Sequence, residues 1–282
     1  NFAAHKHVRS EKDIFSIEAM IENNVLKARQ LLDLLVKYPP EHFFCVSTDK
    51  AANPVNVMGA SKKLMEELIM SYSSKIPIKT ARFANVAFSN GSLPYGFIER
   101  LKKNQPWSCP LNIRRFFVSP EESGQLCLIA SILGESGDIF FPKLSESLHL
   151  ISFSDIALKY LNSIGYDAHI CNSEEEAREL IKTLPEQNKW PCLFTKSDTT
   201  GEKDFEEFYT DKEEIDMRKF KNMGVIKNEL NYDQNQLNDF EDAIIKIKKN
   251  SKWTKESIVD EFFKMIPKFK YVDKGKYLNG KM

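Results

Sequence analysis

The chain has 282 residues, of which 42% are hydrophobic and 28% charged, a composition typical of a globular protein with one large domain or two ordinary ones. Forty basic and forty acidic residues leave no net charge, so the charge balance predicts neither a nucleic-acid partner nor an anionic membrane surface. No run of 18 apolar residues predicts a transmembrane helix, and the first residues do not resemble a signal peptide, so no membrane partner is expected for this chain.

The five cysteines are odd in number, widely spaced and never paired in a CxxC motif. This pattern indicates reduced thiols and a cytoplasmic protein, and it favours neither a disulfide nor a metal site. His5 and His7 are spaced like metal ligands on a strand, but no carboxylate or cysteine stands at a suitable distance in the sequence. We therefore interpret residues 1–13 as a polar loop that is either solvated or lies at the edge of a cofactor site, and we expect no metal.

The first predicted helix runs from an N-cap at Ser16 to about Lys37, and the run Tyr38-Pro39-Pro40 ends it. Its apolar residues recur with the helical period and form a wide face. Asn24 interrupts that face, and a buried amide requires hydrogen-bond partners. The sequence therefore predicts an interior polar contact at Asn24.

Residues 43–62, FFCVSTDKAANPVNVMGASK, have the pattern of a buried strand, a polar loop and a helix. The apolar run Phe43–Val46 ends abruptly in the polar cluster Ser47–Lys50, and a helix from about Gly59 to Ser73 follows. Ligands of parallel α/β sheets bind at the carboxyl ends of the strands. The polar cluster is therefore expected at the end of the strand where such proteins carry out their chemistry.

Strands and helices continue to alternate up to residue 141, which predicts an α/β fold with a doubly wound parallel sheet. The expected strands are 78–86, 114–119 and 137–141, and the expected helices are 94–103 and 120–133. Asn85 and the run Ser89–Ser92 again follow the end of a strand. From residue 152 the pattern predicts mainly helices, at 154–164, 174–184, 213–223, 232–250 and 254–265.

With these motifs, the chain resembles the UDP-N-acetylglucosamine 4,6-dehydratases of bacterial surface-glycan biosynthesis, members of the extended short-chain dehydrogenase/reductase superfamily. The resemblance rests on STDKAANPVNVMGASK and extends to NFAAHKHVRSEKD, RFANV at 82–86 and RRFFVSPEESGQ from 114. It covers residues 1 to about 165. It implies that 1–90 are the C-terminal part of a Rossmann NAD-binding domain, 91–165 a mixed substrate-binding segment with returning Rossmann elements, and 166–282 a mainly helical extension.

Such an enzyme oxidises C4 of the sugar with NAD, removes water across C5 and C6, and returns the hydride to C6. By the resemblance, Asp49 protonates the departing C6 hydroxyl, Lys50 removes the C5 proton, and Thr48 or a water relays the C4 proton. Lys62 matches the lysine that holds the nicotinamide ribose. Met58 stands where the superfamily usually has the tyrosine of a YxxxK pair, and a thioether cannot exchange a proton. The substitution resembles the branch that keeps the C5 configuration.

The resemblance also implies ligand contacts from other residues. Those expected at NAD are Ala3, Ala4, Asn24, Ser47, Lys62 and Asn85. Those expected at the nucleotide sugar are Lys6, Asn85, Ser92, Arg114 and Arg115, with Arg115 in the place of the family's Arg-Phe pair. From the residues alone, Ser47–Lys50 could instead be a capping turn, Asn85 a strand terminator, and either arginine a surface ion-pair partner.

Two features depart from the family pattern. None of the eleven glycines belongs to a GxGxxG or GxxGxxG turn for a pyrophosphate, so we interpret the chain as a fragment that lacks about three strands of the cofactor domain and binds NAD poorly or not at all. Asn90 stands where many relatives carry arginine. The loop KSDTTGEK, residues 196–203, has groups that can donate to a phosphate, but its spacing is not that of a P-loop.

We therefore predict an NAD-dependent nucleotide-sugar 4,6-dehydratase, acting on UDP-N-acetylglucosamine and forming a homo-oligomer. Two alternatives stay open. A nucleotide-sugar 4-epimerase or reductase of the same superfamily needs the strand and Lys62 but no Asp-Lys pair for elimination. A non-catalytic Rossmann-like interaction module is consistent with the missing glycine turn and the missing tyrosine.

Overall fold

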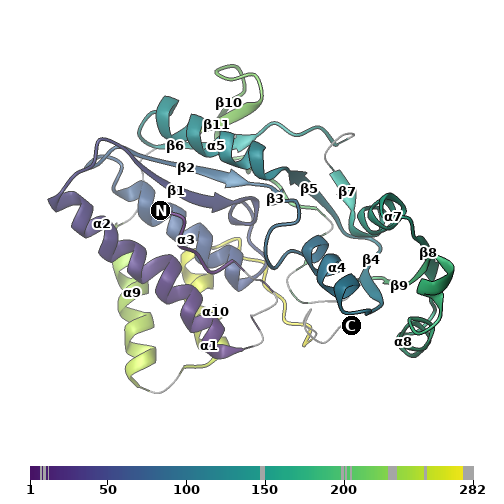
Figure 1. Cartoon of the computed structure of the whole chain (residues 1–282). Coiled ribbons are helices and arrows are strands. Elements are labelled where there is room, and N and C mark those ends of the chain that lie inside the picture. Colours follow the sequence, from purple (N-terminus) through teal and green to yellow (C-terminus); the bar gives the residue numbers. More distant parts are fainter. Residues whose placement is uncertain are drawn as a thin grey trace. The chain divides into compact units, whose positions relative to one another are not determined.

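The computed structural model describes residues 1–6, 8, 11, 13–146, 150–197, 200, 202–203, 205–227, 234–250 and 253–275. The chain divides into two compact units, and each is described by itself (Figure 1). Unit 1 comprises residues 1–84, 121–143 and 206–273, and unit 2 comprises residues 85–120, 144–205 and 274–282.

Unit 1 is built on a five-stranded sheet with the order β1-β2-β6-β11-β10. Strands β1 (Phe43–Thr48), β2 (Ile78–Phe83) and β6 (Asp138–Pro142) run parallel to one another. Strands β11 (Met223–Lys227) and β10 (Glu214–Asp216) extend the sheet in antiparallel fashion. Because parallel strands need crossover connections, the helices between them come to cover the faces of the sheet.

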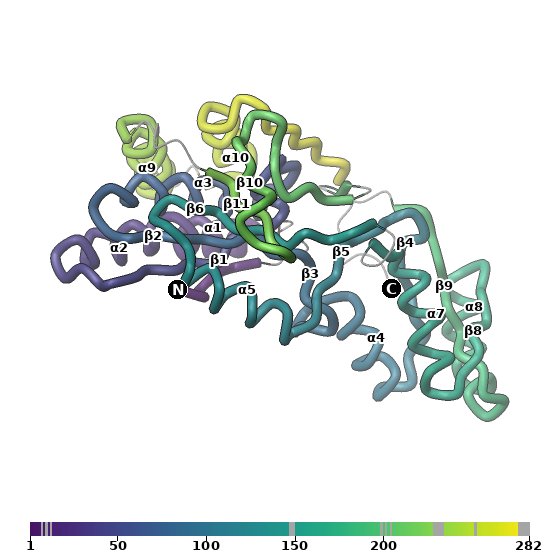
Figure 2. Tube along the Cα trace, turned by 90° about the horizontal axis from the view of Figure 1, so that it is seen from above, coloured from purple at the N-terminus to yellow at the C-terminus, as the bar shows by residue number. Residues whose placement is uncertain are grey.

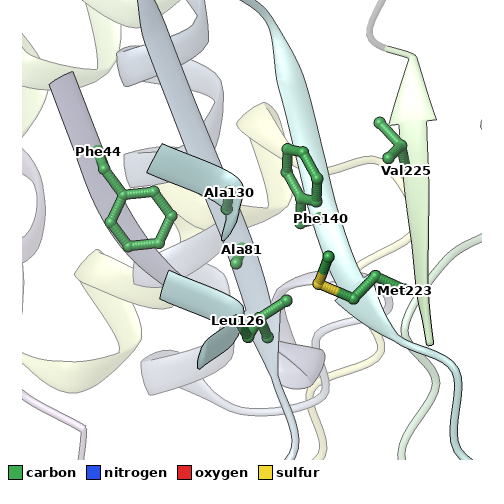
Figure 3. Packing of buried hydrophobic residues seen from close by; sticks show 7 residues of the cluster. All are labelled: Phe44, Ala81, Leu126, Ala130, Phe140, Met223 and Val225. Carbon is green, nitrogen blue, oxygen red and sulfur yellow. The ribbon is translucent and has the colours of Figure 1, made fainter. Parts of the chain in front are cut away.

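Successive side chains of β1 point to opposite faces of the sheet, and a different helix covers each face. Phe44 faces helix α5 (Pro120–Leu133) and joins the hydrophobic cluster of Figure 3, which consists of Phe44, Ala81, Leu126, Ala130, Phe140, Met223 and Val225. Ser47 points to the opposite face, where it hydrogen-bonds to Glu66 of helix α3 (Val57–Ser71). The sheet is thus enclosed between α5 and α3, and the polar end of β1 is held inside the packed layers.

The first helical stretch consists of α1 (Ile14–Ile21), a π-helical segment (Glu22–Leu26) and α2 (Lys27–Lys37). Asp13 caps it, because its carboxylate accepts hydrogen bonds from the backbone N–H groups of Phe15 and Ser16. The expected cap at Ser16 is therefore wrong by three residues. The π-helical segment contains Asn24, at the point where the apolar face is interrupted.

Helices α9 (Gln234–Lys249) and α10 (Lys255–Met265) come from the end of the chain and pack on helices from its beginning, with α10 beside α3 (Figure 2). Arg29 pairs with Glu241, and Lys248 pairs with Glu18 and Glu22, so α9 is tied to the first helical stretch. These helices confirm the expectations for 232–250 and 254–265, although Tyr232 itself lies outside the described residues.

Unit 2 contains two three-stranded sheets. The first has the order β3-β5-β7, with β3 (Asn85–Val86), β5 (Arg114–Val118) and β7 (Leu150–Ser152). The second is parallel, with the order β4-β9-β8, and comprises β4 (Trp107–Pro110), β9 (Lys189–Thr195) and β8 (Asp167–Ile170). Helices α4 (Leu93–Lys102), α7 (Phe153–Ser163) and α8 (Glu174–Leu180) pack on the second sheet. Its buried core consists of Phe97, Trp107, Cys109, Ala157, Leu161, Trp190 and Cys192.

The α/β architecture with parallel strands agrees with the sequence prediction, but several elements differ. The expected strand 78–86 is interrupted at Ala84, and β3 joins a different sheet from β2. The expected helix 213–223 is wrong, because residues 214–216 and 223–227 form β10 and β11 and cover the edge of β6. The sequence analysis also missed β4, β8 and β9. None of the helices that the structure describes has both the length and the apolar character needed to cross a membrane.

Gly224 of β11 offers a test of this packing. A Cβ atom at position 224 would lie closer than 3.0 Å to ring carbons of Phe141, which is buried against Phe208 and Tyr209. Gly224→Ala should therefore lower the free energy of unfolding by about 1–3 kcal/mol, the usual cost of overpacking a core. Gly124→Ala in α5 is the matched control, because a Cβ there meets nothing within 4 Å. Denaturant unfolding should show a loss for the first variant only, and equal stability of the two would contradict the packing.

Candidate functional site

The carboxyl end of β1 and the amino end of α3 frame a polar turn. Thr48 ends β1, the 3-10 turn Asp49–Ala51 follows, and Asn56 caps α3 by accepting a hydrogen bond from the Gly59 N–H at 2.7 Å. A Cβ atom on Gly59 would lie 2.8 Å from the carbonyl oxygen of Lys50. Only glycine therefore allows the helix to approach the turn this closely.

The carboxylate of Asp49 is the centre of the turn. Its Oδ1 accepts hydrogen bonds from Thr48 Oγ1 at 2.8 Å, from the Lys50 backbone N–H at 2.9 Å and from Lys50 Nζ at 3.0 Å. Its Oδ2 is buried and has no hydrogen-bond partner among the described residues, and Asp49 as a whole is only 2% exposed. The structure thus brings a hydroxyl, a carboxyl and an amine together and leaves one carboxylate oxygen without an internal partner.

Lys62 lies in the second turn of α3, behind the end of β1. Its Nζ donates a hydrogen bond to the Val46 carbonyl at 2.8 Å and lies 3.3 Å from Met65 Sδ, so one of the three ammonium hydrogens is unused. Burial lowers the pKa of Lys62, and the neighbouring Cys45 and Glu66 act in the opposite direction. Lys62 can therefore donate one further hydrogen bond to a ligand hydroxyl.

Met58 is buried at the start of α3, four residues before Lys62. Its backbone N–H donates to Glu11 Oε1 at 2.8 Å, so the Glu11 carboxylate caps the helix together with Asn56. Burial raises the pKa of Glu11 to about 7, although hydrogen bonds from the backbone of Met58 and Val57 act to lower it. The sequence analysis missed Glu11, because it stands in a polar loop and only the fold buries it.

Asn24 has the interior partners that the sequence predicts. Its Oδ1 accepts a hydrogen bond from the His5 N–H at 2.9 Å, and its Nδ2 donates to the His5 carbonyl and to Ser61 Oγ, each at 3.0 Å. Both amide hydrogens are therefore used, and Asn24 braces the first loop against α3. A contact between Asn24 and a cofactor stays a prediction.

The first residues of the chain lie beside β1. The amino group of Asn1 donates to the Phe44 carbonyl at 2.6 Å, and its carbonyl accepts a hydrogen bond from the Val46 N–H at 3.3 Å. The residues expected to contact ligands here are exposed or half-buried, namely Ala3, Ala4 and Lys6. His7 lies outside the described residues.

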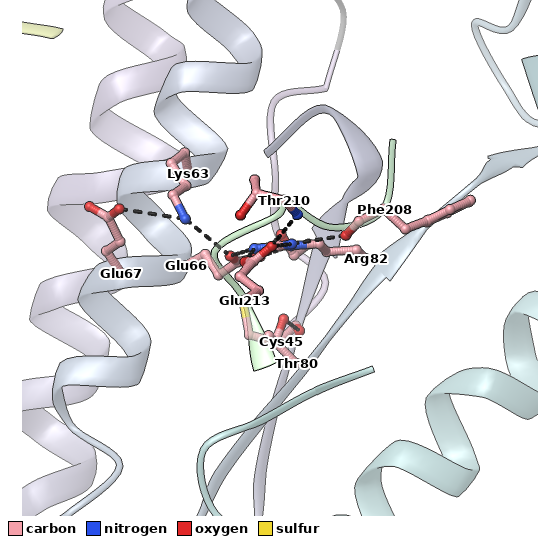
Figure 4. A network of polar contacts seen from close by, with 10 residues as sticks. Cys45, Lys63, Glu66, Glu67, Thr80, Arg82, Phe208, Thr210 and Glu213 are labelled. Carbon is pink, nitrogen blue, oxygen red and sulfur yellow. Dashed lines mark hydrogen bonds and ion pairs between the residues drawn. The ribbon is translucent and has the colours of Figure 1, made fainter. Parts of the chain in front are cut away.

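A buried ion cluster lies between α3 and the end of β2 (Figure 4). Arg82 uses all five of its N–H groups, two on Glu66 at 3.0 and 2.6 Å, two on Glu213 at 3.0 and 2.6 Å, and one on the Phe208 carbonyl at 2.8 Å. Ser47 Oγ donates to Glu66 at 2.7 Å. Burial on its own would raise the pKa of Glu66, but Arg82 lowers it to about 2. Sequence reasoning missed this cluster, because nothing in the sequence pairs Arg82 with the distant Glu213.

The other expected substrate residues lie in unit 2: Asn85, Ser92, Arg114 and Arg115. Asn85 Nδ2 donates to the Phe116 carbonyl at 3.3 Å, and Ser92 Oγ caps α4 by accepting a hydrogen bond from the Tyr95 N–H. Arg114 is exposed, whereas Arg115 is buried and donates to the carbonyls of Arg114 and Lys203. Ligand contacts from these four residues stay predictions. In the loop 196–203, Asp198, Thr199 and Gly201 lie outside the described residues.

The sequence of the chain is similar to proteins of polysaccharide biosynthesis and to nucleotide-sugar epimerases. A family model described as "Polysaccharide biosynthesis protein" matches residues 1–228. The probable polysaccharide biosynthesis protein EpsC of Bacillus subtilis is 28% identical over 214 residues, which are 74% of this chain and 34% of EpsC. A UDP-glucose 4-epimerase of Rickettsia canadensis is 35% identical over 183 residues, which are 59% of this chain and 53% of the epimerase. The chain thus spans about a third to a half of the length of these relatives.

Solved structures share the fold at low sequence identity. Pen from Bacillus thuringiensis matches with a TM-score of 0.64 at 21% identity, over 83% of this chain and 66% of Pen. DesIV from Streptomyces venezuelae, a dTDP-glucose 4,6-dehydratase solved with NAD and TYD bound, matches with a TM-score of 0.55 at 17% identity, over 73% of this chain and 62% of DesIV. The Rossmann-like α/β fold expected from the sequence is confirmed.

The buried carboxyl of Glu11 should make stability depend on pH. Its pKa rises from 4.5 to about 7 on folding. The protonated carboxyl therefore contributes to the free energy of unfolding, and this contribution is fully present below about pH 4.5 and is lost as the pH rises through 7. Glu11→Gln keeps an acceptor for the Met58 N–H but cannot ionise. Relative to this variant, the wild-type free energy of unfolding should fall by up to about 3 kcal/mol over that window, at ~1.4 kcal/mol per pKa unit.

Urea unfolding at several pH values measures this difference, and Glu41→Gln at an exposed position is the control. The control should follow the wild-type pH profile. Identical profiles for Glu11→Gln and wild type would show that Glu11 is not buried as described.

Removal of Arg82 should lower the free energy of unfolding and should change how that free energy depends on pH. Arg82→Met leaves Glu66 buried without its partner, which costs about 3–5 kcal/mol in comparable cases. In the wild type the low pKa of Glu66 contributes stability that is present above about pH 4.5 and lost as the pH falls toward 2. In the variant, protonation of Glu66 should relieve the defect, so the loss of stability should be smaller at pH 4 than at pH 7.

Arg178→Met is the matched control, because Arg178 pairs with Glu174 on an exposed helix surface. It should change thermal and denaturant stability little at either pH. A similarly small effect of Arg82→Met would contradict a structural role for the cluster.

Proposed function

Because the chain belongs to the polysaccharide biosynthesis protein family, we propose that it acts on a nucleotide sugar as an NAD-dependent 4,6-dehydratase, with UDP-N-acetylglucosamine as the substrate. The observation that carries the proposal is the Asp49–Lys50 pair, a carboxyl and an amine 3.0 Å apart at the carboxyl end of a parallel strand. Elimination of water needs an acid and a base on adjacent carbons of the sugar, and this pair supplies both.

Two side chains near the end of β1 support the proposed binding of a nicotinamide dinucleotide. Lys62 has one unused ammonium hydrogen, and Ser47 Oγ donates to Glu66 but keeps its acceptor lone pairs. Lys62 and Ser47 would hold ribose hydroxyls, while Asn24 keeps the first loop in place beside them. Bound NAD would supply the hydride acceptor for C4 and the hydride donor for C6.

The proton transfers can then be assigned to three successive residues. Thr48 Oγ1 lies 2.8 Å from Asp49 Oδ1, so Thr48 would pass the proton of the C4 hydroxyl to the Asp49 carboxylate. The Asp49 acid would then protonate the C6 hydroxyl, which leaves as water. The Lys50 amine would remove the C5 proton and later return a proton to C5. Asp49 and Lys50 each end in the state in which they began, so the cycle is balanced.

Met58 supports the proposal that the proton relay begins at Thr48. Its thioether cannot exchange a proton, and its side chain is buried at the start of α3. An enzyme of this superfamily with a tyrosine at that position would take the C4 proton there. In this chain the hydroxyl of Thr48, bonded to Asp49, is the group on the same turn that can do so.

Substitution of the pair should stop the elimination. In the longest form of the protein that the gene encodes, Lys50→Ala and Asp49→Asn should each lower formation of the 4-keto-6-deoxy sugar by about 10²–10⁴-fold, the usual contribution of a general acid or base. NAD should stay bound. Lys37→Ala, at an exposed position, is the control and should keep full activity. Product NMR in D₂O should show deuterium at C5, and unchanged turnover of Lys50→Ala would refute the assignment.

The matched Rickettsia protein named UDP-glucose 4-epimerase makes epimerisation the second candidate. An epimerase inverts C4 and keeps the C6 hydroxyl, so it has no use for an acid and base pair that acts at C5 and C6. The same NMR experiment separates the candidates. Loss of the C6 hydroxyl identifies the dehydratase, inversion at C4 the epimerase, and no change a non-catalytic module.

A further inference from the structure

The edge of the parallel sheet in unit 2 carries three side chains that converge. Cys171 directly follows β8, His169 lies within β8, and Glu176 lies in the first turn of α8. Their ligand atoms, an imidazole nitrogen, the thiol sulfur and a carboxylate oxygen, all lie within 4.8 Å of one another. None of the three belongs to the candidate active site.

Local structure explains the convergence of these side chains. Residues at i and i+2 of a strand point to the same face, so His169 and Cys171 share a face at the end of β8. The chain then turns at Asn172, and Ser173 caps α8, which brings Glu176 back toward the strand. The backbone N–H of Asn172 donates to Glu176 Oε2 at 2.7 Å, and this hydrogen bond fixes the carboxylate while Oε1 stays available.

The three groups have few other interactions. Among the described residues, no donor or acceptor bonds to the His169 ring, and no lysine or arginine forms an ion pair with Glu176. The Cys171 sulfur makes a long contact, 3.7 Å, with the His169 carbonyl and also interacts with the backbone of Cys192. Cys171 is buried, and His169 and Glu176 are half-buried, so the cluster opens to solvent on one side. Apart from the Asn172 contacts to Glu176 Oε2, the imidazole, the thiol and the carboxylate face one another with few competing partners, which is unusual in a folded protein.

We propose that His169, Cys171 and Glu176 bind one Zn²⁺ ion, with water at the fourth position. Nitrogen, sulfur and oxygen ligands suit zinc, whereas calcium and magnesium take oxygen ligands only. Zinc bond lengths of about 2.0–2.3 Å at tetrahedral angles place ligand atoms roughly 3.3–3.8 Å apart, so shifts of about 1 Å complete the site. A thiolate and a carboxylate also balance the charge of the ion, and the metal would tie the edge strand β8 to α8.

This inference departs from the expectation that the cysteines hold no metal. The sequence contains no CxxC pair, and the spacing His-x-Cys-x₄-Glu matches no common zinc motif. The ligands are assembled by the turn at Asn172 and by the cap at Ser173, which the sequence alone does not show. The inference is independent of the proposed reaction, since it involves neither Asp49 nor Lys50.

Cobalt substitution tests the site directly. Protein treated with a chelator and titrated with Co²⁺ should bind one equivalent and show the visible bands of a tetrahedral ion together with thiolate-to-cobalt charge transfer, and Zn²⁺ should displace the cobalt. Cys171→Ser should remove the charge-transfer band. Loss of a partner in the outer shell of a metal site weakens metal binding by about 10–100-fold. His169→Gln and Glu176→Gln remove direct ligands, so each should weaken Zn²⁺ binding by more than that.

Two matched controls keep the test specific. Cys127→Ser changes a half-buried thiol in α5, and Glu175→Gln changes the exposed neighbour of Glu176, and both should bind cobalt like the wild type. Zn²⁺ should also raise the melting temperature of the wild type and the controls but not of the ligand variants, as expected for a ligand that binds the folded state. Far-UV circular dichroism checks that His169→Gln and Glu176→Gln remain folded. Absence of stoichiometric binding, or the same spectrum and affinity in the folded ligand variants, would overturn the proposal.

Discussion

The buried guanidinium of Arg82 determines how the late part of the chain joins the sheet. Its five N–H groups bind Glu66 of α3, Glu213 and the Phe208 carbonyl, so β2, α3 and the segment before β10 meet at one charged group. A buried pair that loses one member leaves an uncompensated charge, so none of the three elements can move away alone. Because β10 begins directly after Glu213, the same contact places the β10–β11 hairpin where it can pair with the open edge of β6.

The cluster also supports the candidate site through α3. Glu66 binds Ser47, and Lys62, one turn earlier on the same helix, binds the Val46 carbonyl. Two side chains of one helix therefore hold two successive residues of β1, immediately before the turn that carries Thr48, Asp49 and Lys50. Reacting groups must be held to within a fraction of an ångström to be effective, and a rigid strand end fixed from behind meets that condition.

The sequence predicted the elements that have a clear apolar periodicity within their own segment. It failed for elements whose structure depends on contacts with residues far away in the sequence. The first helical stretch, α3 and α5 show apolar residues at helical spacing, and their existence could be read directly. In the segment 213–223, apolar residues at 215, 220 and 223 among charges imitate a helix, but residues 214–216 pair with β11, which in turn pairs with β6. The candidate site likewise has parts that the local sequence shows and parts that depend on long-range contacts. The motif STDK identifies the candidate residues, whereas the contacts of Glu11 with Met58 and of Arg82 with Glu66 depend on the tertiary fold.

The unpartnered oxygen of Asp49 distinguishes this carboxylate from the other buried acids of unit 1. Glu66 and Glu11 are equally buried, and each accepts hydrogen bonds from groups that the fold brings to it. Among the described residues, the other buried side-chain atoms without a partner are the indole nitrogens of Trp107, Trp190 and Trp253, which are neutral donors. A buried acceptor without an internal hydrogen bond costs about 1–3 kcal/mol, so the surroundings of Oδ2 set Asp49 apart from Glu66 and Glu11, whose carboxylates are bound by the fold.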